Sequence, residues 1–452
     1  MPHFDLIVRN GLVVSSTGER RADLGVIDGM FAAIEPELGG TARDVIDVEG
    51  AVVYPGAVDP HVHFNEPGRT DWEGWASGSA ALAAGGGTTC LEMPLNATPP
   101  TLDRASFTAK AEAASAKSHV DFGLWGGLTP TNLDHLEDLA GCGVIGFKAF
   151  MSASGTVDFQ HADDDTLFRG MALAARLGLP VAVHAENDAI TSGMAASLRR
   201  SGHTSARDYL ASRPVVAELE AIGRAITLAE AAGCALHVVH VSTGRGVAMI
   251  AEARGRGIDV TCETCPHYLL FTGEDVERIG ALAKCAPPLR DRQTQEELWS
   301  ALEMGDVDWI ASDHSPAPSS MKTGDDFFAI WGGISGCQHL IEATIPACLE
   351  RGIPPQQIAR LIATNAAGRF RLDGKGDIAV GKDADFTWGH AAEPRSLNRQ
   401  HVHYRHPASL WDHHPLGWRV RGTVLRGTLV ALDSRIVAPP SGRLLRPDGP
   451  VS

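Results

Sequence analysis

The sequence predicts an α/β fold in which a (β/α)8 barrel occupies the middle of the chain. Short β-rich runs alternate with helical patterns over roughly 320 residues, as in barrels of parallel strands. A doubly wound open sheet has the same local pattern, so the number of strands is what favours the barrel. The eight β-rich runs cover residues 53–58, 88–93, 120–125, 144–150, 180–185, 235–241, 258–264 and 309–312.

Helical patterns lie between these runs, with apolar residues at intervals of three and four. The clearest are FTAKAEAASAK, DDTLFRGMALAARLG, VVAELEAIGRAITLAEAAG and QTQEELWSALEMG. Each one follows a β-rich run along the chain. This order is the one that a barrel of βα units requires.

The two chain ends have a different sequence pattern from the middle of the chain. Residues 4–53 contain alternating runs such as DLIVRNGLVV between glycines, a pattern typical of antiparallel hairpins. The same alternating pattern occurs again from Gly376 onward, in GDIAVGKDADFTW and WRVRGTVLRGTLVAL. We therefore predict one small β domain built from residues 1–53 and 376–452, and a barrel formed by residues 54–375.

Composition narrows the class of protein. The chain has 452 residues and a formal net charge of −16, which argues against a partner such as nucleic acid that needs a basic face. No stretch approaches about 18 uninterrupted apolar residues, so we expect no membrane span. The first residues lack the apolar run of a signal peptide, and the 8 cysteines are too scattered for a disulfide framework. We expect a cytoplasmic protein with reduced thiols.

The strongest local motif is VDPHVHF, at the end of the first β-rich run. His61 and His63 are two residues apart on a strand, so their side chains point to the same face. Two imidazoles in this arrangement can bind a divalent metal ion. A second pair, His401 and His403, lies in the C-terminal segment, where we expect a structural role.

Other polar residues lie near the carboxyl ends of later β-rich runs. In a barrel, side chains at these ends meet in one place. A lysine buried among apolar neighbours would be costly as an ammonium ion. The residues are Lys148 in GFKAFM, His184 in VAVHAEN, His240 in LHVVHVST and Asp313 in WIASDHSP.

This set of six residues resembles the amidohydrolase superfamily, and within it the cyclic amidohydrolases, namely the dihydroorotases, hydantoinases and allantoinases. The resemblance covers nearly the whole chain and implies a (β/α)8 barrel with a flanking β-sandwich made from both chain ends. It implies that His61 and His63 bind one metal ion together with Asp313, and that His184 and His240 bind a second. Lys148 would be carbamylated and bridge the two ions.

This ligand set implies a hydrolase. Two divalent cations lower the pKa of a bridging water, and the resulting hydroxide can attack a ring carbonyl. Asp313 would take up the proton and deliver it to the leaving nitrogen. Imidazole and carboxylate ligands favour zinc, with cobalt, manganese or iron as alternatives.

Two positions narrow the choice of cyclic-amide substrate. Asn65 stands where dihydroorotases place an arginine for the substrate carboxylate, and KAFMSASG lacks the tyrosine of hydantoinases. HFNEPGRT, MPLN, SDHSP and WGGISG are similar to allantoinases. The resemblance therefore implies hydrolysis of allantoin to allantoate, with a hydantoinase (dihydropyrimidinase) as the alternative and a dihydroorotase less favoured.

The resemblance also suggests groups that contact a small ureide substrate. Asn96 and Ser315 match family positions for this role, and Gly332 and Gly333 would present their backbone to the substrate. Asp59 is expected to orient a histidine of the metal site. Cys262 and Cys265 form a CETC motif without a second pair, so we expect them to pack in the core. The family also suggests a homotetramer.

Overall fold

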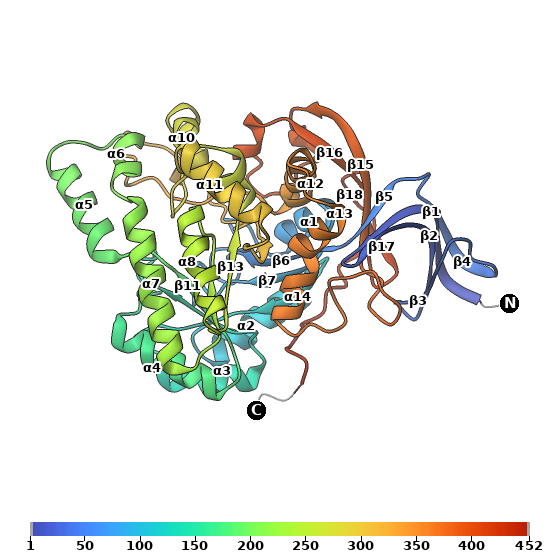
Figure 1. Cartoon of the computed structure of the whole chain (residues 1–452), viewed down its shortest axis with the longest axis horizontal. Helices are drawn as coiled ribbons and strands as arrows, with labels where there is room; N and C mark the ends of the chain where they lie inside the picture. The colour runs from blue at the N-terminus through green and yellow to red at the C-terminus, as the bar shows by residue number, and fades with distance from the viewer. Residues whose placement is uncertain (1–2, 450–452) are drawn as a thin grey trace.

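The computed structural model describes residues 3–449 and has the predicted α/β architecture. Figure 1 shows a barrel ringed by helices on one side of the molecule and a β-rich unit on the other. The first strands of the chain and the last ones lie side by side in that unit, although some 330 residues separate them. The fold is a (β/α)8 barrel with a flanking β-sandwich.

The barrel wall consists of parallel strands in two connected sheets. One sheet has the order β6-β7-β8 and the other β14-β13-β12-β11-β10-β9. Only Trp125 separates β8 from β9, so these two form successive halves of one barrel strand. The strands are β6 (Ala57–Val62), β7 (Gly87–Glu92), β8 (Asp121–Leu124), β9 (Gly126–Gly127), β10 (Phe147–Phe150), β11 (Val181–His184), β12 (Leu236–Val238), β13 (Val260–Thr264) and β14 (Trp309–Ile310).

The ring closes where the first strand meets the segment after the last. Val62 and His314 form a parallel bridge, and the amide of His63 donates to the carbonyl of His314 at 2.8 Å. The strands that line the barrel are short, and most of their residues are buried, as expected for parallel strands covered by helices.

The four helical patterns of the sequence are all helices. Their ends follow capping chemistry: the Asp163 side chain accepts from the amide of Thr166 at the start of α4, and Arg176 lies in its last turn. The helices are α1 (Trp75–Ala84), α2 (Arg104–Ser115), α3 (Leu136–Cys142), α4 (Asp164–Arg176), α5 (Asp188–Arg200), α6 (Ala206–Ala211), α7 (Val215–Ala232), α8 (Gly244–Gly255), α9 (Pro266–Leu270), α10 (Gly273–Ile279), α11 (Arg292–Glu303), α12 (Leu340–Glu350), α13 (Pro355–Ala359) and α14 (Asn365–Arg369).

The chain ends meet in one nine-stranded sheet of order β18-β17-β16-β15-β5-β1-β2-β3, with β4 paired to β1. Leu24, Phe31, Val53 and Phe386 pack in its own apolar core. The strands are β1 (His3–Ser15), β2 (Gly18–Ile27), β3 (Met30–Glu35), β4 (Thr41–Asp47), β5 (Val52–Pro55), β15 (Phe386–Arg395), β16 (Leu416–Leu425), β17 (Thr428–Leu432) and β18 (Arg435–Ile436).

The division into residues 1–53 with 376–452 and residues 54–375 stays a prediction. Residues 1–2 and 450–452 lie outside the described part of the chain. The predicted limit at residues 53/54 falls inside β5, which belongs to the nine-stranded sheet.

The prediction that the first β-rich run, residues 53–58, forms a single barrel strand is wrong. The chain breaks at Gly56 into β5, which joins the sandwich, and β6, which joins the barrel. A Cβ at Gly56 would lie 2.2 Å from the Thr88 side chain, so the break requires glycine. This junction places the first strand of the barrel directly against the sandwich.

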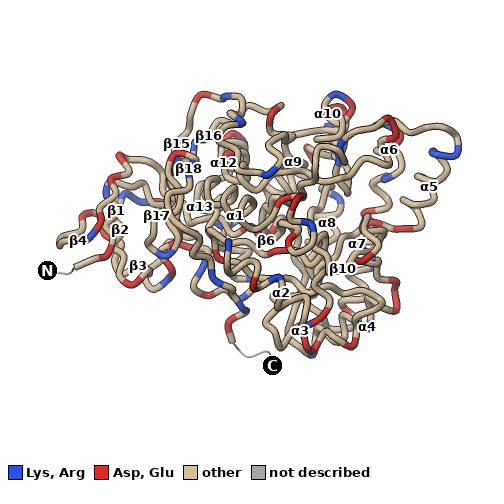
Figure 2. Tube along the Cα trace, turned by 180° about the vertical axis from the view of Figure 1, so that it is seen from behind, with Lys and Arg blue, Asp and Glu red and all other residues tan. Residues whose placement is uncertain are grey.

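Charged residues of both signs are interspersed along the outer helices and strands (Figure 2). A buried group of them links the two units: Lys375 Nζ lies 2.5 Å from Asp121 of β8 and 2.7 Å from Asp385. Within residues 3–449, no helix is both long and apolar enough to cross a membrane.

Candidate metal centre

The six predicted ligands come from five barrel strands and lie at or just beyond their carboxyl ends. His61 lies in β6 and His63 follows it, while Lys148 lies in β10 and His184 ends β11. His240 and Asp313 come two and three residues after β12 and β14. All six are between 0% and 9% exposed. The structure brings all of them together at one end of the barrel.

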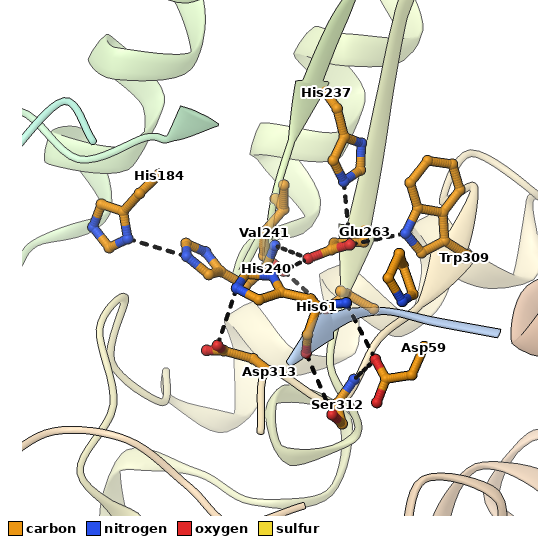
Figure 3. Close-up of polar contacts among 12 residues, drawn as sticks. Asp59, His61, His184, His237, His240, Val241, Glu263, Trp309, Ser312 and Asp313 are labelled. Atoms are coloured by element: carbon orange, nitrogen blue, oxygen red, sulfur yellow. Dashed lines mark hydrogen bonds and ion pairs between the residues drawn. The ribbon is translucent and has the colours of Figure 1, made fainter. Parts of the chain in front are cut away.

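The first cluster contains His61, His63 and Asp313, whose ligand atoms all lie within 4.8 Å of one another. Nε2 of His61 is 3.2 Å from Oδ1 of Asp313, and Nε2 of His63 is 3.5 Å from the same oxygen. Figure 3 shows Asp313 directed at the imidazole of His61.

Hydrogen bonds on the far side of each ring decide which nitrogen carries the proton. Nδ1 of His61 donates to Oε1 of Glu263 at 2.5 Å, and Nδ1 of His63 donates to the carbonyl of Leu95 at 3.2 Å. A carboxylate or carbonyl oxygen can only accept, so both protons are on Nδ1. Two nitrogen lone pairs and a carboxylate oxygen therefore face one another, an arrangement that a cation stabilises.

The second cluster contains His184 and His240. Nδ1 of His184 is 3.0 Å from Nε2 of His240, and Nε2 of His184 donates to Glu186 at 2.9 Å. The lone pair of His184 Nδ1 therefore faces the ring of His240. The ring of His240 is 5.4 Å from that of His61, centre to centre, so the two clusters are adjacent.

Burial lowers the pKa of His61, His184 and His240. The three imidazoles are therefore neutral at pH 7, which is the form that binds metal ions. For Asp313, burial opposes ionisation, but His61 and His63 beside it hold its pKa below the usual value. Asp313 is thus in its carboxylate form at pH 7.

Lys148 is fully buried, and its Nζ has no hydrogen-bond partner among the described residues. Burial lowers its pKa to about 7, although Glu263 and Asp313 nearby favour the ammonium form. An unpaired amine in this setting fits a group that is converted to an anionic metal ligand better than it fits a permanent cation.

A cavity of about 380 Å³ opens over the two clusters. Its wall includes the four histidines, Asp313 and all four predicted substrate-contact residues, which are Asn96, Ser315, Gly332 and Gly333. Asn96 has a φ of 30°, and Gly333 has a φ of 139° with Ser315 so close that a Cβ would clash. Lys148 lies below the cavity wall.

Asp59 does not orient a histidine ring, contrary to expectation. Its Oδ1 accepts from the backbone amides of His61 and Ser312. The ring of His61 is instead oriented by Glu263, which the sequence analysis missed. The only signal for it was a carboxylate inside a β-rich run, between Cys262 and Cys265.

The matches with known proteins agree with this site. Residues 52–397 match the amidohydrolase family, and the chain belongs to that family. It is 57% identical over 448 residues to an allantoinase of Rubrobacter xylanophilus, covering 99% of this chain and 98% of that protein. It is 51% identical to an allantoinase of Deinococcus radiodurans, covering 98% of this chain and 99% of that protein.

Solved structures show the same architecture. The L-hydantoinase (dihydropyrimidinase) of Arthrobacter aurescens superimposes with a TM-score of 0.94 at 34% sequence identity, covering 98% of this chain and 100% of that one. A D-hydantoinase superimposes with a TM-score of 0.90 at 30% identity, covering 98% of both chains.

Proposed function

We propose that this enzyme hydrolyses the ring amide of allantoin to give allantoate. The observation that carries the proposal is the full-length identity of 57% to an allantoinase, combined with a cavity over two clusters of metal-binding groups. The enzyme is a hydrolase of cyclic amides.

We propose that His61, His63 and Asp313 hold one divalent ion and that His184 and His240 hold the other. The facing lone pairs of the first cluster and the 3.0 Å approach of the two imidazole nitrogens in the second support this assignment. Nitrogen and carboxylate donors suit zinc, with cobalt, manganese or iron as alternatives. When bound, the ions polarise the ring carbonyl and lower the pKa of a water molecule.

We propose that Lys148 is carbamylated and bridges the two sites. The neutral amine attacks the carbon of carbon dioxide, an N–C bond forms as one C=O π bond breaks, and the nitrogen loses a proton to water. The product is an anionic group with two oxygen donors, which removes the cost of a buried ammonium. The unpaired Nζ and its lowered pKa support this step.

Asp313 is the proposed catalytic residue. Its carboxylate reaches the cavity and is ionised at neutral pH, so it can take a proton from the attacking water. It then delivers that proton to the ring nitrogen as the C–N bond breaks. Oδ1 of this carboxylate lies 3.2 Å from Nε2 of His61 and 3.5 Å from Nε2 of His63.

Substrate recognition is assigned to the cavity wall. Asn96 and Ser315 offer polar side chains to the ureide, and Gly332 and Gly333 offer backbone groups. The Asn65 amide is fully buried and donates to the carbonyl of Pro316 at 3.3 Å, so this position supplies no cation for a substrate carboxylate. This arrangement supports allantoin over dihydroorotate.

The deciding experiment compares the hydrolysis of allantoin, hydantoin, dihydrouracil and dihydroorotate by the purified, metal-loaded enzyme. We expect the highest kcat/KM for allantoin. Turnover of dihydrouracil with allantoin inert would identify a hydantoinase instead. The homotetramer and the cytoplasmic location stay predictions, and sedimentation analysis tests the first.

A further inference from the structure

Glu263 occupies an unusual position below the first cluster. Its side chain is 1% exposed and accepts hydrogen bonds on both oxygens. Oε1 accepts from the ring of His61 at 2.5 Å, and Oε2 accepts from Nε1 of Trp309 at 2.8 Å and from Nε2 of His237 at 3.2 Å. Figure 3 shows Glu263 between these three rings.

These contacts fix one particular form of His61. The Trp309 indole can only donate, and Glu263 also accepts from His237. These contacts hold the Glu263 carboxylate on the side away from His61. Because a carboxylate can only accept, His61 must be the donor in its contact with Glu263. The proton of His61 is thereby held on Nδ1, and Nε2 keeps its lone pair toward Asp313. The other tautomer would point a proton at Asp313 and could not bind an ion.

Glu186 has the same relationship to the second cluster. It is fully buried, and it accepts from Nε2 of His184 at 2.9 Å and from the guanidinium of Arg213. The proton of His184 is held on Nε2, so Nδ1 keeps its lone pair toward His240. Glu186 comes from the loop after β11 and Glu263 from β13, and Oε1 of Glu263 also accepts from the backbone amide of His240 at 3.4 Å.

We propose that Glu263 and Glu186 are positioning residues, one for each metal ion, which select the metal-binding tautomers of His61 and His184. This inference rests on the proposed function, because it presupposes that the two clusters bind ions. It adds that each ion depends on its own buried carboxylate outside the ligand set. Loss of such a partner typically weakens metal binding by about 10- to 100-fold.

The chain contains a matched control. Asp59 is also fully buried beside His61, but there its Oδ1 accepts from the backbone amides of His61 and Ser312. An amide oxygen can replace that contact, so Asp59→Asn keeps the tautomer of His61. Glu263→Gln cannot, because its NH2 group must face either His61 or the donors on Trp309 and His237.

The test uses zinc-loaded and cobalt-loaded full-length protein. We expect Glu263→Gln and Glu186→Leu to bind metal about 10 to 100 times more weakly than the wild type in competition with a chelator, and Asp59→Asn to match the wild type. We also expect the visible absorption of bound cobalt to change in both glutamate variants only. A merely structural role would lower the unfolding temperature and leave that spectrum unchanged.

The outcomes separate the two proposals. Wild-type protein that is active on allantoin without stoichiometric metal would overturn the proposed function and this inference with it. Wild-type protein that holds two ions, with glutamate variants that retain metal as Asp59→Asn does, would overturn this inference alone. If Glu263→Gln fails to fold, Glu186→Leu decides the matter with the same two measurements, because both donors contact the same Glu186 oxygen and an amide oxygen could replace it.

Discussion

Nζ of Lys148 lies 5.2 Å from the centre of the Phe150 ring, and the same ring stacks on the imidazole of His184. The ring planes of Phe150 and His184 are 9° apart, with centres at 4.6 Å. One aromatic side chain therefore contacts two proposed ligands from different strands. It also excludes water from Lys148, which explains why burial dominates the pKa of that amine.

Lys148→Ala tests the bridging role. We expect this variant to lose most of its metal and its activity, because the anionic bridge is gone. Added short-chain carboxylic acids should restore part of both, since a carboxylate can occupy the vacated space. Elemental analysis and an allantoin assay measure the two effects. Full metal content without added acid would contradict the role.

The pH dependence of carbamylation follows from the lowered pKa of Lys148. Only the neutral amine adds carbon dioxide, and a pKa of about 7 makes it the minor form below pH 7 and the major form above. At constant dissolved carbon dioxide, we expect activation of metal-free protein by carbon dioxide and zinc to rise about tenfold from pH 6 to pH 8. An increase that begins only near pH 10 would indicate an ordinary lysine.

Asp313→Asn separates proton transfer from metal binding. An amide oxygen can still face His61 and His63, so we expect much of the metal to remain. An amide cannot take up or deliver the proton, so kcat should fall by about 100- to 10,000-fold. Metal content and kcat are measured on the same preparation. Unchanged turnover would remove Asp313 from the mechanism.

We expect Arg69 to affect substrate affinity by holding Asn96 in position. Its guanidinium donates to the carbonyl of Asn96 at 2.5 Å and lies 5.2 Å from the ring centre of Trp72, which packs edge-on against Trp331 of the cavity wall. Removing a charged hydrogen bond costs about 1.5–3 kcal/mol. We therefore expect Arg69→Met to raise KM roughly 10-fold or more, with a smaller change in kcat.

The control for Arg69→Met is Arg104→Met. Arg104 lies on the surface beside Asp138, with 60% of its side chain exposed, and should leave both constants unchanged. Equal KM values in the two variants would show that the Arg69 contact does not position Asn96.

Lys375 should contribute strongly to stability. Its buried ammonium neutralises Asp121 and Asp385 at the junction of barrel and sandwich. Lys375→Met leaves buried carboxylates without this partner, so we expect the free energy of unfolding to fall by about 3–5 kcal/mol. Urea unfolding followed by tryptophan fluorescence measures it. The exposed pair Arg169–Asp165 provides the control, where Arg169→Met should cost about 0–1 kcal/mol.

The barrel could be predicted because each βα unit repeats the same local pattern. The four helical patterns are confirmed as α2, α4, α7 and α11. The break at Gly56 was missed although Pro55-Gly56 is a turn signal, because β-prone apolar residues continue beyond it on both sides. Only pairing with β15 on one side and β7 on the other separates β5 from β6.

In the candidate site, the positions of the ligand candidates could be predicted, but the contacts of their neighbours could not. The six ligand candidates stand at strand ends, where the sequence pattern alone places them near one another. The roles of Glu263 and Asp59 were harder to predict, because they depend on which neighbour each side chain contacts across the barrel. Glu263 and His61 are 202 residues apart, and no periodicity in the sequence relates them.

The proposed ligands extend from His61 to Asp313, and ring closure at His314 follows the last of them immediately. During synthesis, a chain released from the ribosome only as far as β13 would hold five of the six donors but lack the carboxylate on which His61 and His63 converge. Ions would therefore be acquired late, after most of the chain has been translated.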